Sequence, residues 1–321
     1  MRIRTGSRLH MGFLSLPENT DSERTWGGIG LMLEHPGIEL SAEPSQDWHA
    51  EGPLSQRVLQ FARMVTVAFA DKNKSFPLSF RINRGAPEHS GLGTGTQLGL
   101  AVARLMLAIY QCPNMPGPSL AKMVGRGKRS ALGIHGFDLG GFLVEAGKRP
   151  KEEIAPLIHR SAFPENWPIL LILPERQQGL HGSAESQAMD KLIKALPTAK
   201  LCRLVLQDIL PALAAGNYPT FGEAVYEYNR LVGESFRSVQ GGVYSHAKSE
   251  AVVSFLRREG VLAVGQSSWG PALFSIVNDA MQADTLRLRL CERFAFSDKE
   301  VLLTAPKNGP AGVVTTDSDG N

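Results

Sequence analysis

The fold of this chain is decided by the stretch Pro87-Glu88-His89-Ser90-Gly91-Leu92-Gly93-Thr94-Gly95-Thr96, which runs straight into an apolar segment, residues 97–110. In that segment Leu98, Val102 and Leu105 share one helical face, and further apolar residues occupy another. A helix that is apolar nearly all round is buried at the centre of its domain. A polar, glycine-rich loop that opens such a helix is therefore the strongest functional signal in the sequence.

This loop has the features of a phosphate-binding site. An anion at a helix N-terminus meets unpaired backbone N–H groups and the positive end of the helix dipole. Glycines let the backbone approach the anion closely, and threonine hydroxyls can bond to a phosphate oxygen or to a metal-bound water. We therefore predict that phosphate is bound by Ser90, Gly91, Leu92, Gly93, Thr94, Gly95 and Thr96.

Two common phosphate-binding motifs do not fit the loop. The sequence Gly-Lys-Ser or Gly-Lys-Thr of a Walker A loop is absent from it. A dinucleotide fingerprint would need Gly-x-Gly-x-x-Gly in a strand–helix unit with an acidic residue downstream. The alternative to phosphate binding is a glycine-rich turn that only starts a helix.

Composition limits the class of protein. The chain has 321 residues, which favours two domains, and a net charge of +3, which is too small to indicate nucleic acid or an anionic membrane as partner. Cys112, Cys202 and Cys291 lie far apart, so we expect neither a disulfide framework nor a structural zinc site. Without a signal peptide or an apolar run of about 18 residues, the expectation is a soluble, cytoplasmic protein with no membrane partner.

The order of predicted elements indicates a mixed α/β protein with two domains, 1–160 and 161–321. The glycine-rich segment Trp26–Leu31 is expected to be irregular, and Asn278 is a plausible N-cap. The C-terminal half reads β-α-β-β-α-β, a ferredoxin-like arrangement with an inserted helical section. Strands are predicted at Met1–Thr5, Gly37–Ala42, Leu78–Ile82, Gly141–Ala146, Pro168–Leu173, Val261–Gly265, Ala272–Val277 and Val301–Ala305, and helices at Pro53–Asp71, Pro118–Ser130, within Ser183–Ser235, at His246–Arg258 and at Asp279–Phe294.

The loop resembles the second motif of the GHMP kinase superfamily, in which Pro-x-x-x-Gly-Leu-Gly-Ser-Ser precedes a buried helix. The glycine-containing segment Val264–Ala272 stands where that superfamily carries its third motif, and the β-α-β-β-α-β order agrees with its fold. The resemblance implies a GHMP-kinase-like N-terminal domain followed by a ferredoxin-like C-terminal domain, in a two-layer α+β arrangement with the site between the domains.

Within the superfamily, the chain looks most like the β-ribofuranosylaminobenzene 5′-phosphate synthases. The segments that carry this resemblance are Arg8–Phe13, Trp26–Gly30, Gly125–Ala131, Gly136–Phe142 and Gly179–Glu185. Membership of that family implies condensation of phosphoribosyl pyrophosphate with 4-aminobenzoate, with release of pyrophosphate and carbon dioxide, in tetrahydromethanopterin biosynthesis and one-carbon metabolism. It also implies Mg²⁺ as cofactor. The oligomeric state is left open, with a homodimer as the candidate.

The resemblance suggests roles for further residues. Arg8 or His10 would meet the benzoate carboxylate or a second phosphate, and Asp138 would bind Mg²⁺ or position the amine. The substrate-binding candidates are Gly27, Gly28, Lys128, Arg129, Ser267 and Ser268. Each has a structural alternative: a surface ion pair for Arg8, a hydrogen-bonded core histidine for His10, a turn-forming aspartate for Asp138, a solvated helix end for Lys128 and Arg129, and a hairpin turn for the two serines.

The sequence departs from the kinases at the position of their catalytic base. They carry Ser-Gly-x-Asp, whereas this chain has Leu132-Gly133-Ile134-His135, with Asp138 three residues further on. His135 is either a substitute base or a turn residue. The synthase reading is therefore preferred over an ATP-dependent small-molecule kinase and over a non-catalytic ligand sensor built on the same fold.

Overall fold

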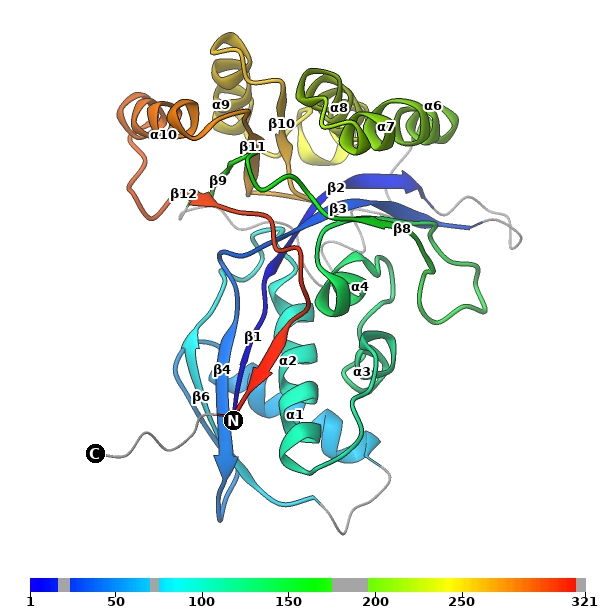
Figure 1. The fold of residues 1–321 in the computed structure, drawn as a ribbon, viewed down its shortest axis with the longest axis vertical. Helices are drawn as coiled ribbons and strands as arrows, with labels where there is room; N and C mark the ends of the chain where they lie inside the picture. The colour runs from blue at the N-terminus through cyan, green and yellow to red at the C-terminus, as the bar shows by residue number, and fades with distance from the viewer. Residues whose placement is uncertain (17–23, 70–74, 175–195, 316–321) are drawn as a thin grey trace.

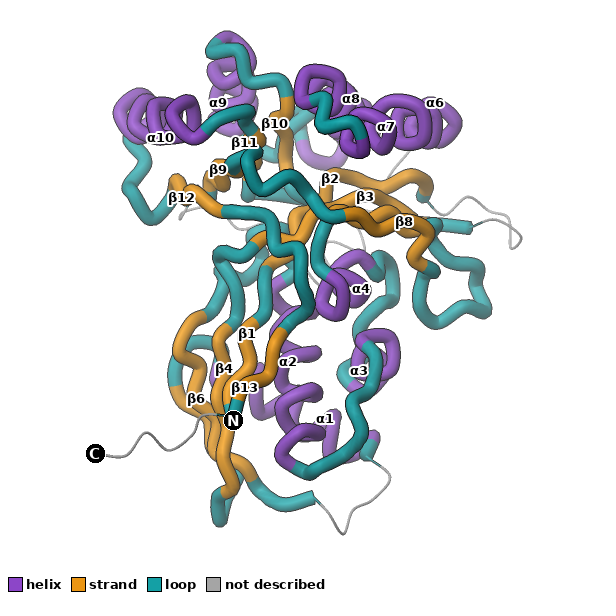
Figure 2. Tube along the Cα trace, viewed as in Figure 1, coloured by secondary structure: helices purple, strands orange, loops and turns teal. Residues whose placement is uncertain are grey.

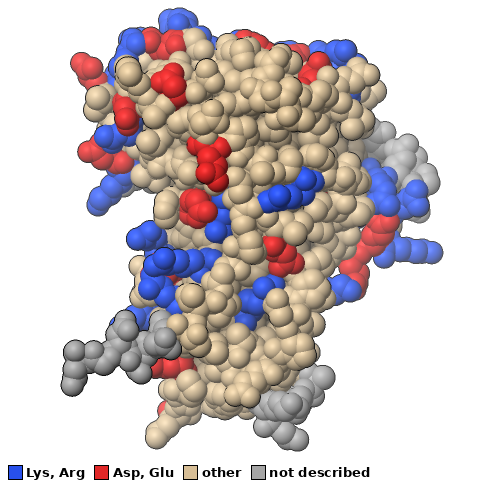
Figure 3. Space-filling model, viewed as in Figure 1, with Lys and Arg blue, Asp and Glu red and all other residues tan. Residues whose placement is uncertain are grey.

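The computed structural model describes residues 1–16, 24–69, 75–174 and 196–315. Figure 1 shows an elongated molecule in which one group of helices and strands lies below a central sheet and a second group lies above it. Both groups contain helices and strands (Figure 2), which confirms the mixed α/β class. On the face drawn in Figure 3, basic and acidic side chains are interspersed.

The lower part is a five-stranded sheet covered by helices. Its strand order is β13-β1-β4-β6-β5, and every pair is antiparallel except β5 with β6. The strands are β1 (Arg2–Arg4), β4 (Glu39–Pro44), β5 (His49–Glu51), β6 (Leu78–Arg84) and β13 (Gly312–Val314). The helices are α1 (Ser55–Ala68), α2 (Thr94–Ile109), α3 (Gly117–Met123) and α4 (Leu132–Leu139).

Helix α2 is the centre of this lower domain. Eleven of its residues are buried, on all sides of the helix, so the predicted buried helix is confirmed. Leu98, Val102 and Leu105 belong to one apolar cluster with side chains from α1 and from the sheet. This packing fixes the direction of α2 and so fixes where its N-terminus meets the rest of the molecule.

A second sheet crosses the middle of the molecule, with strand order β2-β3-β7-β8. Strand β2 is one edge of this sheet. Two glycine-containing loops lie beside it, the phosphate loop and the loop around Ser268. The strands are β2 (Ser7–Ser15), β3 (Trp26–Leu33), β7 (Phe142–Glu145) and β8 (Leu157–Ser161).

The upper part has the predicted ferredoxin-like order. Its antiparallel sheet runs β10-β11-β9-β12, so the first strand in sequence pairs with the third and fourth. The strands are β9 (Ile169–Ile172), β10 (Ala263–Gln266), β11 (Leu273–Ile276) and β12 (Val301–Thr304). The helices are α6 (Thr198–Arg203), the π-helical η2 (Leu204–Ile209), α7 (Leu210–Ala214), α8 (Tyr218–Gln240), α9 (Ala247–Arg258) and α10 (Ala280–Phe294).

Four local predictions need correction. The glycine-rich segment that starts at Trp26 is strand β3, because its glycines allow close pairing: a Cβ on Gly30 would stand 2.5 Å from the carbonyl oxygen of Leu9. Helix α3 ends at Met123 because Gly125 and Gly127 have φ of +63° and +91°. Helix α4 occupies the stretch predicted as a turn. The N-cap of α10 is Asp279, whose side chain accepts from the N–H of Gln282.

The division of the chain at residue 160 remains a prediction. Strand β13 lies beyond that point and pairs with β1 in the lower sheet, in the register Ile3 with Val313. The lower domain is thus completed by residues from the far end of the chain. Segment Gly179–Glu185 and the first part of the predicted helical section, up to residue 195, lie outside the described residues.

Candidate active site

Strand β2 brings three sequence motifs together along its free edge. The N–H of Arg8 donates to the carbonyl of Leu92 in the phosphate loop at 2.8 Å. Two residues further on, the N–H of His10 donates to Ser267 Oγ at 3.0 Å, and the His10 carbonyl accepts from the N–H of Ser268 at 2.9 Å. The N-terminal strand is therefore bonded to both glycine-containing loops at consecutive outward positions.

The two loops also bind each other directly. Ser267 Oγ donates to the Gly91 carbonyl at 2.8 Å, and the N–H of Ala272 donates to the Ser90 carbonyl at 3.1 Å. A side chain on Gly91 would stand 2.3 Å from the Ser267 carbonyl oxygen, so glycine is required there by this contact. Ser267 thus joins the domains, while Ser268 faces the cavities.

The phosphate loop opens α2 in the predicted way. Gly93 is the residue before the helix and has φ of +71°, a left-handed conformation that favours glycine. The hydroxyls of Ser90 and Thr94 donate to the Pro87 carbonyl at 2.9 and 2.7 Å, so their protons stabilise the loop rather than face a ligand. The N–H groups of Thr96 and Gln97 already donate to the Gly93 carbonyl, at 3.0 and 3.1 Å. The Thr96 hydroxyl and the N–H groups at the very start of the helix remain for an anion.

A cavity of about 590 Å³ lies over this loop and is strongly basic. It is lined by Arg8, Arg57, Arg126 and Arg129, and Glu88 is the one carboxylate among the described residues that line it. We call this cavity the arginine cleft. It holds the loop residues from Ser90 to Thr96 and, from the upper domain, Ser268, Trp269 and Gly270.

Arg57 and Arg126 converge on the N-terminus of α2. A Cβ on Gly95 would lie 2.7 Å from an Arg57 Nη atom and 3.1 Å from an Arg126 Nη atom. Both guanidinium groups stack over the Phe61 ring, at 5.7 and 5.2 Å from its centroid, and Arg57 also pairs with Glu88. Burial and the charge of Arg57 lower the pKa of Arg126. Cations crowded together in this way favour a polyvalent anion between them.

Other predicted residues take different places. Lys128 is exposed and is not among the residues that line the cleft. Gly27 and Gly28 lie in close contact with neighbouring backbone instead. A Cβ on Gly27 would be 3.0 Å from the carbonyl carbon of Ala146, and one on Gly28 would be 2.5 Å from the Gly12 carbonyl oxygen. His135 lies in α4, where its Nε2 is 2.8 Å from the Ala155 carbonyl oxygen.

Asp138 is not brought to the arginine cleft, which corrects the prediction that it acts there. It sits near the end of α4, pairs with Arg104 at 2.8 Å and accepts from the N–H of Gly117, at the start of α3. It lines a separate cavity of about 660 Å³. The physical reason is the unpredicted helix α4, which turns Asp138 away from the loop and uses it to hold α3.

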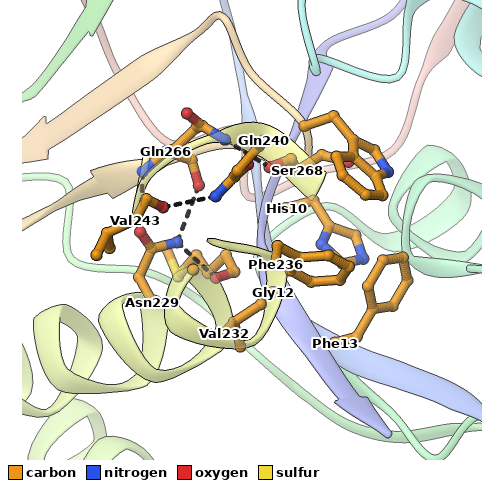
Figure 4. Close-up of a pocket in the computed structure, with 13 residues that line it drawn as sticks. His10, Gly12, Phe13, Asn229, Val232, Phe236, Gln240, Val243, Gln266 and Ser268 are labelled. Carbon is orange, nitrogen blue, oxygen red and sulfur yellow. Dashed lines mark hydrogen bonds between the residues drawn. The ribbon is translucent and has the colours of Figure 1, made fainter. Parts of the chain in front are cut away.

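A second, smaller pocket adjoins the arginine cleft on its upper side. Phe13, Phe236 and Trp269 provide aromatic walls, and His10 faces the interior (Figure 4). The free volume is about 20 Å³, enough for one water molecule. Ser268 and Trp269 line both cavities, so the two share a wall. We call this the aromatic pocket.

Glu145 is a buried carboxyl group that the sequence did not single out. It is fully buried on β7, its Oε2 accepts from the N–H of Ala131 at 2.6 Å, and its Oε1 has no partner among the described residues. Burial raises its pKa to about 7, against the lowering effects of Ser130 and the nearby Arg8. The carboxyl therefore titrates near neutral pH.

The variant Glu145→Gln is expected to gain stability relative to the parent as pH rises from about 5 to about 8. A raised pKa means that the folded chain holds a proton that the unfolded chain releases above the ordinary pKa of 4.5, so stability falls between pH 4.5 and about 7. The full effect is on the order of 3 kcal/mol. Urea titrations at both pH values measure it.

The matched control for that experiment is Glu39→Gln. Glu39 pairs with Arg2 and Arg4, and its hydrogen bond with Arg2 lowers its pKa. Its carboxylate is therefore charged throughout that pH range, and the difference from the parent should stay constant there. An equally constant difference for Glu145→Gln would show that Glu145 does not titrate near neutral pH.

No cluster of three or more His, Cys, Asp or Glu side chains suited to a metal exists among residues 1–16, 24–69, 75–174 and 196–315. Among the described residues that line the arginine cleft, the side-chain oxygen groups are the Glu88 carboxylate and the hydroxyls of Ser90, Thr94, Thr96 and Ser268. Mg²⁺ is commonly held by one or two such groups together with substrate phosphates.

Within the same ranges, no helix is both long and apolar enough to cross a bilayer.

Comparison with known proteins agrees with this architecture. Residues 57–144 match the model "GHMP kinases N terminal domain" and residues 209–295 match "GHMP kinases C terminal". The structure is similar to homoserine kinase from Cytophaga hutchinsonii, with a TM-score of 0.70, 14% identity and coverage of 98% and 97% of the two chains. Mevalonate kinase from Methanococcus jannaschii gives 0.69, with 12% identity and coverage of 96% and 98%.

Sequence comparison narrows the family further. The chain is 31% identical over 301 residues to the β-ribofuranosylphenol 5′-phosphate synthase of Methanothermobacter thermautotrophicus, covering 86% of this chain and 88% of the relative. The synthase of the same name from Methanocaldococcus jannaschii is also 31% identical, over 86% and 89% of the two chains. The chain therefore belongs to the GHMP kinase superfamily and, within it, to the family of the β-ribofuranosylphenol 5′-phosphate synthases.

Proposed function

We propose that this protein condenses phosphoribosyl pyrophosphate with 4-hydroxybenzoate and releases pyrophosphate and carbon dioxide. The observation that carries the proposal is the pairing of two cavities on one strand: a cleft lined by four arginines and a smaller pocket with aromatic walls. The first suits a substrate with a phosphomonoester and a diphosphate, and the second suits a benzene ring.

The choice of acceptor differs from the sequence-based expectation. The resemblance implied 4-aminobenzoate, whose product is an aniline, whereas the relatives are named for a ribofuranosylphenol phosphate. A phenol product requires a hydroxyl group where 4-aminobenzoate carries its amine. 4-Aminobenzoate is thus the competing acceptor, and the product belongs to methanopterin biosynthesis with either one.

In the proposed reaction the arginines stabilise the leaving diphosphate. Arg57 and Arg126, at the N-terminus of α2, neutralise its charge as the bond to the anomeric carbon breaks. Arg8 belongs to strand β2 and lies beside the loop, where its guanidinium donates to the Gly91 carbonyl at 3.3 Å. That place suits a clamp for the acceptor carboxylate beside the anomeric carbon.

Mg²⁺ fits this arrangement as an ion that is bound mainly by the diphosphate of the substrate. The Thr96 hydroxyl would hold it, with the diphosphate supplying the other oxygens, because the Glu88 carboxylate is already paired with Arg57. When bound, the ion supplies further neutralisation of the leaving group. This assignment replaces Asp138, which is committed to Arg104 and Gly117. A homodimer remains an untested expectation.

The second candidate is an ATP-dependent kinase, favoured by the likeness to homoserine and mevalonate kinases. A catalytic base would have to stand beside the phosphate loop. Glu88 is the one carboxylate among the residues that line the cleft, and it is already paired with Arg57. We therefore expect no acceptor-dependent formation of ADP from ATP with homoserine or mevalonate.

The deciding experiment mixes the protein with Mg²⁺, phosphoribosyl pyrophosphate and carboxyl-labelled 4-hydroxybenzoate. Labelled carbon dioxide and pyrophosphate should appear in equal amounts, with 4-aminobenzoate run in parallel. Parallel tubes hold ATP with homoserine or mevalonate. ADP formed with either of these alcohols, without release of carbon dioxide from the benzoates, would replace the synthase by a kinase. Binding without any turnover would favour a sensor.

A further inference from the structure

The aromatic pocket lies at the junction of both domains. His10, Gly12 and Phe13 come from strand β2, Val232 and Phe236 come from helix α8, and Trp269 comes from the loop after β10. The His10 and Phe13 rings are 4.6 Å apart, and the Phe236 and Trp269 rings are 4.7 Å apart. Figure 4 shows the imidazole pointing toward the space between Phe13 and Phe236.

Two buried polar groups in this pocket have no partner. His10 is 1% exposed, and neither of its ring nitrogens has a hydrogen bond within the described part of the chain. Trp269 is 6% exposed, and its indole N–H also has no hydrogen-bond partner among the described residues. An unmet buried polar group costs about 1–3 kcal/mol, so such groups indicate a missing partner. The amides around them are satisfied: Asn229 binds the Met11 and Gln266 carbonyls.

The spacing along β2 indicates the shape of that partner. Arg8 and His10 are two residues apart on one strand, so they lie on the same face about 6.7 Å from each other. Arg8 lines the arginine cleft and His10 lines the aromatic pocket. A para-substituted benzoate with a hydrogen bond at each end spans more than this Cα–Cα distance, and the long side chain of Arg8 makes up the difference. One molecule can therefore reach both residues through the shared wall at Trp269.

We infer that the aromatic pocket receives the ring of the acceptor, with its carboxylate at Arg8 and its para hydroxyl at His10, and that His10 is the base that takes the hydroxyl proton. This inference rests on the proposed function. It adds the site of the acceptor and the residue that distinguishes its para substituent.

The proton and electron movements balance. The O–H electron pair moves into the ring as its proton passes to a His10 nitrogen, and the carboxyl-bearing carbon attacks the anomeric carbon. The bond to diphosphate breaks and its electron pair leaves with diphosphate, which gives a dienone. The bond to the carboxylate then breaks, carbon dioxide leaves, and its electron pair restores the aromatic ring. The resulting phenolate recovers the proton from His10.

The state of His10 suits this role. Burial, and secondly the charge of Arg8, hold the pKa of His10 well below its ordinary value, so the imidazole is neutral and can accept a hydrogen bond from the para hydroxyl. The negative charge that develops on the phenol oxygen favours the protonated imidazole and so raises the basicity of His10 during the transfer. Entry of the ring requires movement, because the pocket now holds no more than a water molecule. Trp269 is the element to move, since it forms the wall between the two cavities.

The test measures binding of aromatic acids without turnover. Inorganic pyrophosphate fills the arginine cleft, and calorimetry records the affinity for 4-hydroxybenzoate and for benzoate. His10→Gln should weaken 4-hydroxybenzoate about 10- to 100-fold and leave benzoate unchanged, because only the former has a group for His10. The matched control is His246→Gln, an exposed histidine before α9. Equal affinities of His10→Gln and parent for 4-hydroxybenzoate would overturn the inference.

Turnover gives an independent readout. His10→Gln should lower kcat with 4-hydroxybenzoate by about 10²- to 10⁴-fold, the usual contribution of a general base. The loss with 4-aminobenzoate should be smaller, because an amine lone pair is available before any proton leaves. An equal loss with both acceptors would reduce His10 to a structural residue. If His10→Gln does not fold, Phe236→Leu replaces it, because Phe236 lines the aromatic pocket and not the arginine cleft, and it should alter binding of both benzoates but not of pyrophosphate.

The two proposals fail in different ways. If neither acceptor turns over but 4-hydroxybenzoate binds in a His10-dependent way, the pocket assignment stands and the condensation reaction does not. If both acceptors turn over and His10→Gln behaves like the parent, the reaction stands and the pocket assignment is wrong.

Discussion

Replacing Arg57 and Arg126 together by alanine is expected to lower the affinity for phosphoribosyl pyrophosphate by about 3–6 kcal/mol, or roughly 10²- to 10⁴-fold. Each guanidinium stands at the N-terminus of α2, within reach of Gly95. Each would make a charge-assisted bond to the diphosphate, so the double variant removes two such bonds. Calorimetry with the intact substrate and no acceptor measures the loss.

The control for this double variant is Arg289→Ala. Arg289 pairs with Glu259 and stacks over Phe255, much as Arg57 pairs with Glu88 and stacks over Phe61, but it lies on α10, away from the cleft. It should bind substrate like the parent. The cleft assignment fails if the double variant melts at the parental temperature and still binds phosphoribosyl pyrophosphate with parental affinity.

Arg8→Ala is expected to lower kcat/KM for 4-hydroxybenzoate by about 2–4 kcal/mol. The carbon that carries the carboxylate must attack the ribose, so the carboxylate has to be held beside the anomeric carbon until carbon dioxide leaves. A guanidinium holds it with two hydrogen bonds. Arg8→Lys keeps the charge but loses the second bond, and should raise KM for the benzoate more than KM for phosphoribosyl pyrophosphate.

Two acceptors without a carboxylate distinguish a carboxylate contact at Arg8 from a general effect of losing its positive charge. Phenol and aniline lack the carboxylate, so any residual activity with them should be the same in Arg8→Ala and in the parent. Parental kinetics of Arg8→Ala with 4-hydroxybenzoate would show that Arg8 only supports the loop, through its bond to the Gly91 carbonyl.

The buried helix and the C-terminal half follow from local patterns in the sequence. Helix α2 was predictable because its apolar residues recur on every side, and strands β9 to β12 because alternation and length are local properties. Strand β3 was not predictable in this way. Its glycines normally disfavour a strand, and the reason for them, the close approach of β2, is a tertiary contact.

The same distinction between local patterns and tertiary contacts decides which parts of the site were predictable. The loop residues are contiguous, so their chemistry is readable from the sequence. Arg57 and Arg126 belong to separate segments, and only the packing of α1 and α3 around Phe61 brings them to one loop. Asp138 shows the opposite error: a carboxylate next to glycines suggested chemistry, whereas helix α4 turns it toward Arg104.

The pairing of β1 with β13 also bears on how the protein is made. A ribosome releases Arg2–Arg4 about 310 residues before Gly312–Val314, yet the two strands are neighbours in one sheet. Until the last of these residues emerges, β1 exposes an unpaired backbone edge of the kind that invites intermolecular association. The lower domain, which contains the phosphate loop, can therefore close its sheet only after the upper domain has been synthesised in full.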